Sequence, residues 1–221
     1  MIRPWPREAI WRASGQTGPE ENQESDFHRA SQPFHSDRCA AGFLLHGRRP
    51  WRSEHGSGLQ LAVQSLYATA YTAKFACKGQ GKDFVVMPLE GLWSAPDPES
   101  FTARRKDEWD WTMMIMVPDY VDDAIFQAAK TGAREKIGTL PDSLRLERLE
   151  EGPCLQALHI GSYDDEGPLL AMLHGEIMPS GGYEFAGRHH EVYLSDPRKT
   201  SPERLKTVLR QPVRRNGTPR S

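Results

Sequence analysis

The sequence predicts an α+β fold in which an antiparallel sheet carries helices on one face and leaves a ligand cleft on the other. Three observations predict it. One long segment has apolar residues at helical spacing, several short apolar runs read as strands, and glycines and prolines separate them. The expected order is strand, helix, strand, strand, a linking helix, strand, strand, helix, strand and a final helix. This order fits two half-domains, each built from a helix over antiparallel strands.

The first half of the chain contains the clearest elements. A short apolar run at 40–47, closed by a glycine, predicts a strand. Residues 58–77 form an apolar stripe with spacings of three and four, which predicts a helix. Residues 83–93 read as a strand, with Pro88 confining it to an edge, a bulge or two shorter pieces. Residues 108–117 predict the next strand.

The centre of the chain is predicted from capping and turn residues. Asp119 is the expected N-cap of a helix over 120–131, which Gly132 should end. Two strands follow at 145–150 and 154–160, and the turn residues 151–153 between them predict a hairpin.

A helix is expected at 168–178. The acids Asp164, Asp165 and Glu166 precede it, and the helix dipole alone accounts for them. Ser201 and Pro202 resemble the start of a short final helix ending at Arg210.

The total composition limits the class of protein. The chain has 221 residues, a formal net charge of −2 and 38% hydrophobic residues. This balance gives no sign of a nucleic-acid partner. No apolar run reaches the roughly 20 residues that span a bilayer, so no membrane partner is expected. Cys39, Cys77 and Cys154 are odd in number and widely spaced, which indicates reduced thiols and a cytoplasmic location.

Three regions are expected along the chain. Residues 1–38 are polar and aperiodic, and we predict a disordered N-terminal extension. Residues 39–213 form the predicted domain, and 214–221 form a basic tail.

The stretch at 189–200 is the most informative part of the sequence. It reads as a strand that stops at Ser195-Asp196-Pro197. Alternation along the strand puts His189, Glu191 and Tyr193 on one side. Val192 and Leu194 are on the other side, which we expect to pack inward. Glu191 is either an exposed residue of no special role or the carboxylate of a site with aromatic walls.

Several aromatic residues are candidates for those walls. Tyr67 and Tyr71 are four residues apart, so they are neighbours on a helix, at the edge of the core or lining a cleft. Trp109 and Trp111 share one side of their strand, either buried under a helix or forming a binding surface. His189 and His190 point to opposite sides and cannot chelate one ion together, so no metal and no cofactor are expected.

Five segments together make the chain resemble the GyrI-like family of small-molecule-binding domains, in a stand-alone form. They are PLEGLW at 88–93, WTMMI at 111–115, HIGSYDDE at 159–166, HHEVYLSDPRKT at 189–200 and LKTVLR at 205–210. The resemblance covers about residues 42 to 213. It implies a pseudo-symmetric pair of strand-helix-strand-strand repeats. They form a cleft that binds bulky planar aromatic, often cationic, compounds.

The resemblance also implies the site residues. The buried glutamate of the family maps to Glu191, with Tyr193 beside it as a hydrogen-bond donor in the catalytic group. The ligand-binding rings map to Trp93, Trp111, Trp109, Tyr163 and Tyr71. Tyr193 is one of these rings as well.

Stand-alone members of the family include hydrolases that open the cyclopropane of DNA-alkylating natural products. The hypothesis is therefore a protective hydrolase in which Glu191 deprotonates a water molecule. The planar compound would be held between Trp93 and Trp111. The alternatives are a non-catalytic protein that sequesters or senses such compounds and a gyrase-inhibitor-like protein. A monomer or homodimer is expected.

Overall fold

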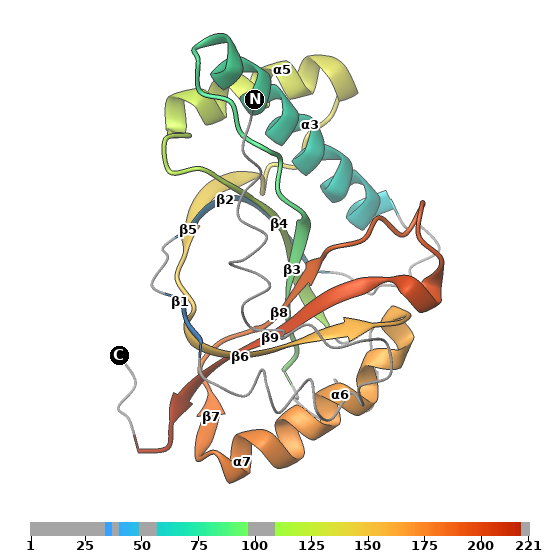
Figure 1. The fold of residues 1–221 in the computed structure, drawn as a ribbon. Helices are drawn as coiled ribbons and strands as arrows, with labels where there is room; N and C mark the ends of the chain where they lie inside the picture. The colour runs from blue at the N-terminus through green and yellow to red at the C-terminus, as the bar shows by residue number, and fades with distance from the viewer. Residues whose placement is uncertain (1–33, 37–39, 49–56, 97–108, 218–221) are drawn as a thin grey trace. The chain divides into compact units, whose positions relative to one another are not determined.

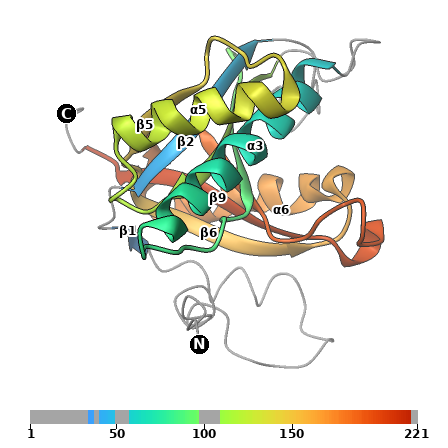
Figure 2. The ribbon, with the colours of Figure 1, turned by 90° about the horizontal axis from the view of Figure 1, so that it is seen from above.

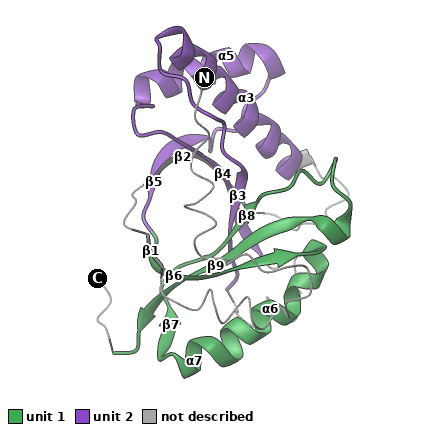
Figure 3. Ribbon diagram, viewed as in Figure 1, with its two compact units in different colours: residues 1–37, 151–221 green, residues 38–150 purple. Residues whose placement is uncertain are grey.

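The computed structural model describes residues 34–36, 40–48, 57–96 and 109–217 (Figure 1). The chain forms two compact units, residues 38–150 and residues 1–37 with 151–221 (Figure 3). The prediction that residues 1–38 are disordered concerns mostly residues outside the described ranges, and so does the end of the predicted basic tail. Within the predicted extension, residues 34–36 form a strand. No helix in the described ranges combines the length and the apolar character needed to cross a membrane.

The described residues of the unit 38–150 form a four-stranded antiparallel sheet with two helices. Its elements are β2 (Ala40–Arg48), α3 (Ser57–Gly79), β3 (Leu89–Ser94), β4 (Asp110–Val117), α5 (Asp123–Ile137) and β5 (Arg145–Leu149). Within the unit the strand order is β3-β4-β2-β5. Helices α3 and α5 lie side by side (Figures 1 and 2).

Helix α3 confirms the predicted apolar stripe. Ala62, Leu66, Ala70 and Ala73 are all buried. Small side chains along this stripe allow close packing of a neighbouring helix. The helix was predicted at 58–77 and spans Ser57–Gly79.

Helix α5 begins and ends later than predicted. Its N-cap is Asp122, whose carboxylate accepts a hydrogen bond from the Ile125 N–H at 2.9 Å. Gly132 does not end the helix, because it lies within it and faces α3. A Cβ atom at Gly132 would be 3.0 Å from the Thr72 methyl group. The helix ends at Gly138, which has a φ of 82° that favours glycine.

The unit completed by residues 151–221 is also an antiparallel sheet with a helical segment. The strands are β1 (Phe34–Ser36), β6 (Gly152–Ile160), β7 (Tyr183–Phe185), β8 (His189–Tyr193) and β9 (Lys206–Arg215). The strand order within the unit is β1-β6-β9-β8, with β7 on β9. The helical segment consists of η2 (Tyr163–Glu166), α6 (Gly167–Met172), the π-helical turn η3 (Leu173–Ile177) and α7 (Met178–Ser180).

The two units repeat one topology. The series β2, α3, β3, β4 corresponds to β6, the helical segment, β8 and β9, apart from the short strand β7. The strand orders also agree, since β3-β4-β2-β5 corresponds to β8-β9-β6-β1. The predicted pair of strand-helix-strand-strand repeats is confirmed.

Three further local predictions, about strands and turns, were wrong. The strand expected at 83–93 begins only after Pro88, and residues 82–88 have no regular structure. The turn at 151–153 does not make a hairpin, because β5 pairs with β2 whereas β6 pairs with β9 and β1. The chain passes from one unit to the other there.

The final helix is the third error. After a single 3-10 turn, η4 (Pro202–Arg204), the chain enters β9, which lies between β6 and β8. The alternating residues Thr207, Leu209 and Gln211 are all buried, as the two-residue period of a strand requires. Strand β9 continues to Arg215, into the segment predicted as a tail.

Candidate functional site

Glu191 is a buried carboxylate on β8. The residue is 6% exposed, so it is not the exposed glutamate of the alternative interpretation. Its position opposite Leu209 of β9 puts the two side chains on the same side of the sheet. Leu209 belongs to the core beneath α6, with Leu169 and Leu170.

The sides of β8 were therefore assigned the wrong way round. Val192 and Leu194, expected to pack inward, are half-buried. The side of Glu191 is the one that bears the helical segment, which lies along one face of β6 and β9 (Figure 1). The carboxylate thus lies on the face of the sheet that packs against the helical segment of its own unit.

Glu191 has one polar side-chain contact within the described part of the chain. Its Oε1 lies 3.5 Å from Nε2 of His189, two residues earlier on the same side of β8. This distance is longer than a normal hydrogen bond, which spans about 2.7–3.2 Å. A buried carboxylate so lightly bonded retains acceptor capacity for a water molecule or a ligand.

Tyr163 and Tyr193 form an aromatic pair in the same unit. Their ring centroids are 5.6 Å apart and their planes meet at 81°, an edge-to-face arrangement. Burial raises the pKa of Tyr163 to about 12, with additional effects from the carboxylates of Glu166, Glu191 and Asp196. Tyr163 is therefore a neutral phenol at physiological pH, with a proton to donate.

The turn that starts the helical segment positions Tyr163. Gly161 has a φ of 147°, and a Cβ atom there would be 3.1 Å from the His159 ring. The Gly161 N–H donates to the Leu205 carbonyl at 3.0 Å. His159 Nε2 lies 3.0 Å from the Ser162 carbonyl oxygen, and Ser162 Oγ donates to Asp165 at 2.7 Å.

Glu166 is a buried residue that sequence reasoning missed. The helix dipole was thought to account for all three acids of this turn, but Glu166 is only 3% exposed. Its charge also acts on Tyr163. The available signal was its position three residues after Tyr163, which is on the same side of a helical turn.

The predicted tryptophans gather in the other unit. Trp93 and Trp111 are directly opposite each other on β3 and β4, so they are neighbours on one side of that sheet. The Trp93 and Trp109 rings are 5.7 Å apart at 71°. All three are at most 9% exposed. They form one aromatic group, with Trp93 and Trp111 adjacent rather than facing each other across a gap.

Tyr71 is separate from this group. It is 46% exposed on α3 and stacks on Tyr67, with centroids 6.4 Å apart. No described contact joins it to the three tryptophans.

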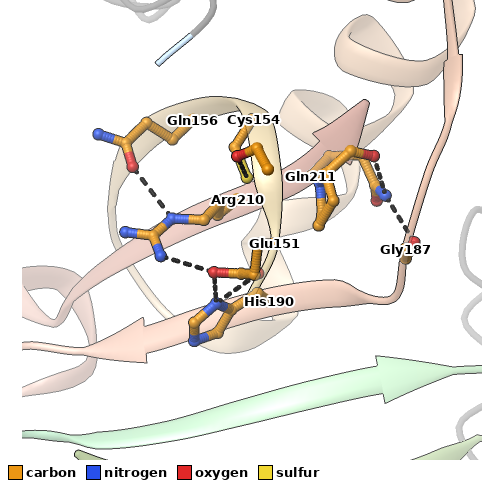
Figure 4. A network of polar contacts seen from close by, with 9 residues as sticks. Glu151, Cys154, Gln156, Gly187, His190, Arg210 and Gln211 are labelled. Atoms are coloured by element: carbon orange, nitrogen blue, oxygen red, sulfur yellow. Dashed lines mark hydrogen bonds and ion pairs between the residues drawn. The ribbon is translucent and has the colours of Figure 1, made fainter. Parts of the chain in front are cut away.

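A second carboxylate with a buried side chain, Glu151, directly precedes β6 and is bonded to His190 on the other side of β8 (Figure 4). His190 Nδ1 lies 2.9 and 3.0 Å from the two oxygens of Glu151. Arg210 Nη1 donates to Glu151 at 2.9 Å, and Arg210 Nε donates to Gln156 at 3.1 Å. Burial raises the pKa of Glu151, but His190 and Arg210 outweigh it, so the pKa lies below its usual range.

A separate hollow of about 300 Å³ contains none of these residues. It lies in the unit of residues 38–150 and carries four acids and one arginine. Its lining residues are Asp119, Val121, Asp122, Asp123, Leu146, Glu147 and Arg148. A mostly acidic surface without a buried polar group gives no reason to place the chemistry there.

Comparison with known proteins shows the family of this chain. The family model described as GyrI-like small molecule binding domain matches residues 47–214. The chain belongs to this family. Its sequence matches no curated protein.

Solved structures show the same fold. An uncharacterized conserved protein from Listeria innocua is 36% identical with a TM-score of 0.72, over 83% of this chain and 91% of its own. A hydrolase from Listeria innocua is 34% identical with a TM-score of 0.67, over 83% and 92%. The C-terminal domain of EcmrR is 12% identical with a TM-score of 0.51, over 80% and 92%, and shows only the fold.

Proposed function

We propose that this GyrI-like domain hydrolyses planar aromatic compounds that carry a strained, electrophilic cyclopropane, and that Glu191 is the base. The observation that carries the proposal is a carboxylate 6% exposed whose polar contact within the described residues is a single 3.5 Å approach to His189. Buried carboxylates normally have saturated hydrogen bonds. One that is not saturated is suited to holding a water molecule or a cation.

The proposed reaction adds one water molecule. Glu191 takes a proton from the water molecule while the water oxygen bonds to the cyclopropane methylene carbon. The carbon–carbon bond breaks, and its electron pair passes into the conjugated dienone of the substrate to give a phenolate. The proton then passes from Glu191 to the phenolate, which restores the carboxylate without oxidation or reduction.

The tyrosine pair supplies the other proposed contacts. Tyr163 remains a neutral phenol because its pKa is raised to about 12, so it can donate a hydrogen bond to the oxygen on which charge develops. The Tyr193 ring offers a face to a planar or cationic group, and such a contact contributes roughly 0.5–2 kcal/mol. Trp93, Trp109, Trp111 and Tyr71 remain predicted ligand contacts.

The relatives support this assignment. One structure 34% identical over most of both chains is named a hydrolase. We place the activity in the cytoplasm, where it would protect DNA from alkylation. Cys77 and Cys154 are free thiols, as is usual there.

Product analysis by mass spectrometry tests the proposal. Purified protein is incubated with a duocarmycin-type cyclopropane compound, alongside Glu191→Gln and the control Glu147→Gln, an exposed residue of β5. The expected result is a product heavier by one water from wild type and control, and none from Glu191→Gln. Equal turnover by Glu191→Gln would overturn the assignment of the base.

Binding without turnover would indicate the second candidate function. If wild type forms no adduct but the compound quenches tryptophan fluorescence, the domain sequesters or senses such compounds. If wild type gives neither the adduct nor the quenching, this class of ligand is rejected.

A further inference from the structure

His189 lies two residues before the proposed base, Glu191, on the same strand. Both residues point to the same side of β8, and the side chains are 3% and 8% exposed for His189 and Glu191. The 3.5 Å contact joins Nε2 of the ring to Oε1 of the carboxylate. A buried imidazole beside a buried carboxylate limits the orientations that the carboxylate can adopt.

The π-helical turn η3 carries a second buried histidine close enough to His189 to feel its charge. His174 of this turn packs edge-on against Phe185, with centroids 5.0 Å apart. Burial, followed by the charge of nearby His189, lowers the pKa of His174 to about 4. His174 is therefore uncharged at neutral pH. Single π-helical turns are frequent at functional sites.

We propose that His189 is a positioning residue that holds one oxygen of Glu191, so that the second oxygen faces the water or the cationic group of the ligand. The part of this inference that concerns catalysis rests on the proposed function. Its basis is the side-by-side placement of the two residues on β8 and the burial of both.

The contact is expected to tighten when ligand binds. Catalytic hydrogen bonds are often long in unliganded structures and shorten in the complex. In the tightened state the ring N–H donates to Oε1, which leaves Oε2 as the basic atom. Misplacing this atom by about 1 Å costs about a hundredfold in rate.

Two substitutions of one residue test the role. His189→Leu keeps an apolar side chain in the buried space but removes the donor. His189→Gln carries an amide N–H at a reach similar to that of Nε2. We expect His189→Leu to lower kcat by about tenfold to a hundredfold with KM within threefold. His189→Gln should recover most of the loss.

His190 provides the matched control, because it is the next residue and points to the opposite side. His190→Gln should lower stability through Glu151 but leave kcat of the folded protein within twofold. Thermal melting of each variant separates loss of fold from loss of rate. An unchanged kcat in folded His189→Leu, or no recovery in His189→Gln, would overturn the proposal. Circular dichroism verifies that both variants are folded.

A binding measurement tests the positioning role if wild type shows no hydrolysis. That result would reject the catalytic function but not the contact. A cationic planar dye such as ethidium is titrated against wild type, Glu191→Gln, His189→Leu and His189→Gln. Equal weakening by Glu191→Gln and His189→Leu, with recovery in His189→Gln, supports positioning. Unchanged affinity in His189→Leu contradicts it.

Nuclear magnetic resonance gives a readout that needs no ligand. Imidazole ¹⁵N signals are recorded for wild type and Glu191→Gln at one pH. The His189 signals should move and the His190 signals should stay. Unmoved His189 signals would show that the two side chains do not interact, and the proposal would fall.

Discussion

Glu151 and Glu191 are two carboxylates with buried side chains, each beside a histidine of β8. Glu191 belongs to β8 and contacts His189, whereas Glu151 precedes β6 and contacts His190, on the opposite side of β8. Glu151 is bonded to His190 and Arg210 at 2.9 Å, and the low pKa of its carboxyl reflects these bonds (Figure 4). Glu191 has a 3.5 Å contact with His189. The same residue type at the same depth therefore has two different environments.

The difference shows how the unit separates stability from chemistry. A buried carboxylate with saturated bonds joins the strands that supply its partners, here β8 and β9. A buried carboxylate with few bonds costs stability and persists where function requires it. Alternation along β8 allows both within adjacent residues, since His189 and His190 point to opposite sides.

The largest expected effect is on activity. Glu191→Gln should reduce hydrolysis at least a hundredfold, because the amide cannot take a proton. Its melting temperature should stay within about 2 °C of wild type or rise, since a neutral amide costs less to bury than a carboxylate. Turnover measurements with differential scanning fluorimetry check both parts. A loss of fold in this variant would place Glu191 with Glu151 among the stabilising residues.

The opposite result is expected for Glu151→Gln. The amide that replaces this carboxylate offers His190 and Arg210 one neutral acceptor oxygen and no negative charge, and breaking such a buried ion pair typically costs about 3–5 kcal/mol. Arg210 keeps some contact with water, so we expect about 2–3 kcal/mol by urea denaturation. The control Glu147→Gln removes an exposed ion pair with Arg145 and should cost at most about 0.5 kcal/mol. An equal effect of the two substitutions would contradict this account.

Acid should remove the same stabilisation. The pKa of Glu151 is lower in the folded state than in the unfolded chain, so its contribution is complete above the unfolded value of about 4.3. The contribution is lost as pH falls through the folded pKa. Wild type should therefore lose more unfolding free energy than Glu151→Gln when denaturation is compared at pH 6 and pH 3. An equal loss of unfolding free energy in wild type and Glu151→Gln would show that Glu151 does not take up a proton upon unfolding.

Sequence reasoning identified the repeated topology because most of its signals are local. The apolar stripe of α3 and the short apolar runs of β2 and β4 each show the period of their own element. Strand β9 was misjudged because Leu205 to Arg210 fits a helix as well as a strand. Only pairing with β6 and β8 decides the matter, and pairing is a contact between distant residues.

The burial of Glu191 could be anticipated from the sequence, but its surroundings could not. Glu191 was singled out because a glutamate in a short strand needs a reason, and it is buried, while its role in a site stays a prediction. The side it occupies was wrong, since two neighbouring apolar residues cannot show which side meets the helices. The bonded carboxylate Glu151 was missed, because the turn residues around it suggested a hairpin and its partners are 39 and 59 residues away.

The smallest expected effect concerns Tyr163. Burial is the largest cause of its pKa of about 12, and Glu191 is one of three carboxylates that add to it. Glu191→Gln should therefore lower this pKa, because a neutral neighbour no longer opposes formation of the phenolate. Glu151→Gln should leave it unchanged, since Glu151 is not among the charges that act on the phenol. The titration can be followed through the ¹³Cζ signal of labelled tyrosine up to the pH at which the protein unfolds. A Tyr163 signal that begins to titrate at the same pH in wild type and Glu191→Gln would mean that the carboxylate lies too far from the ring to serve one substrate with it.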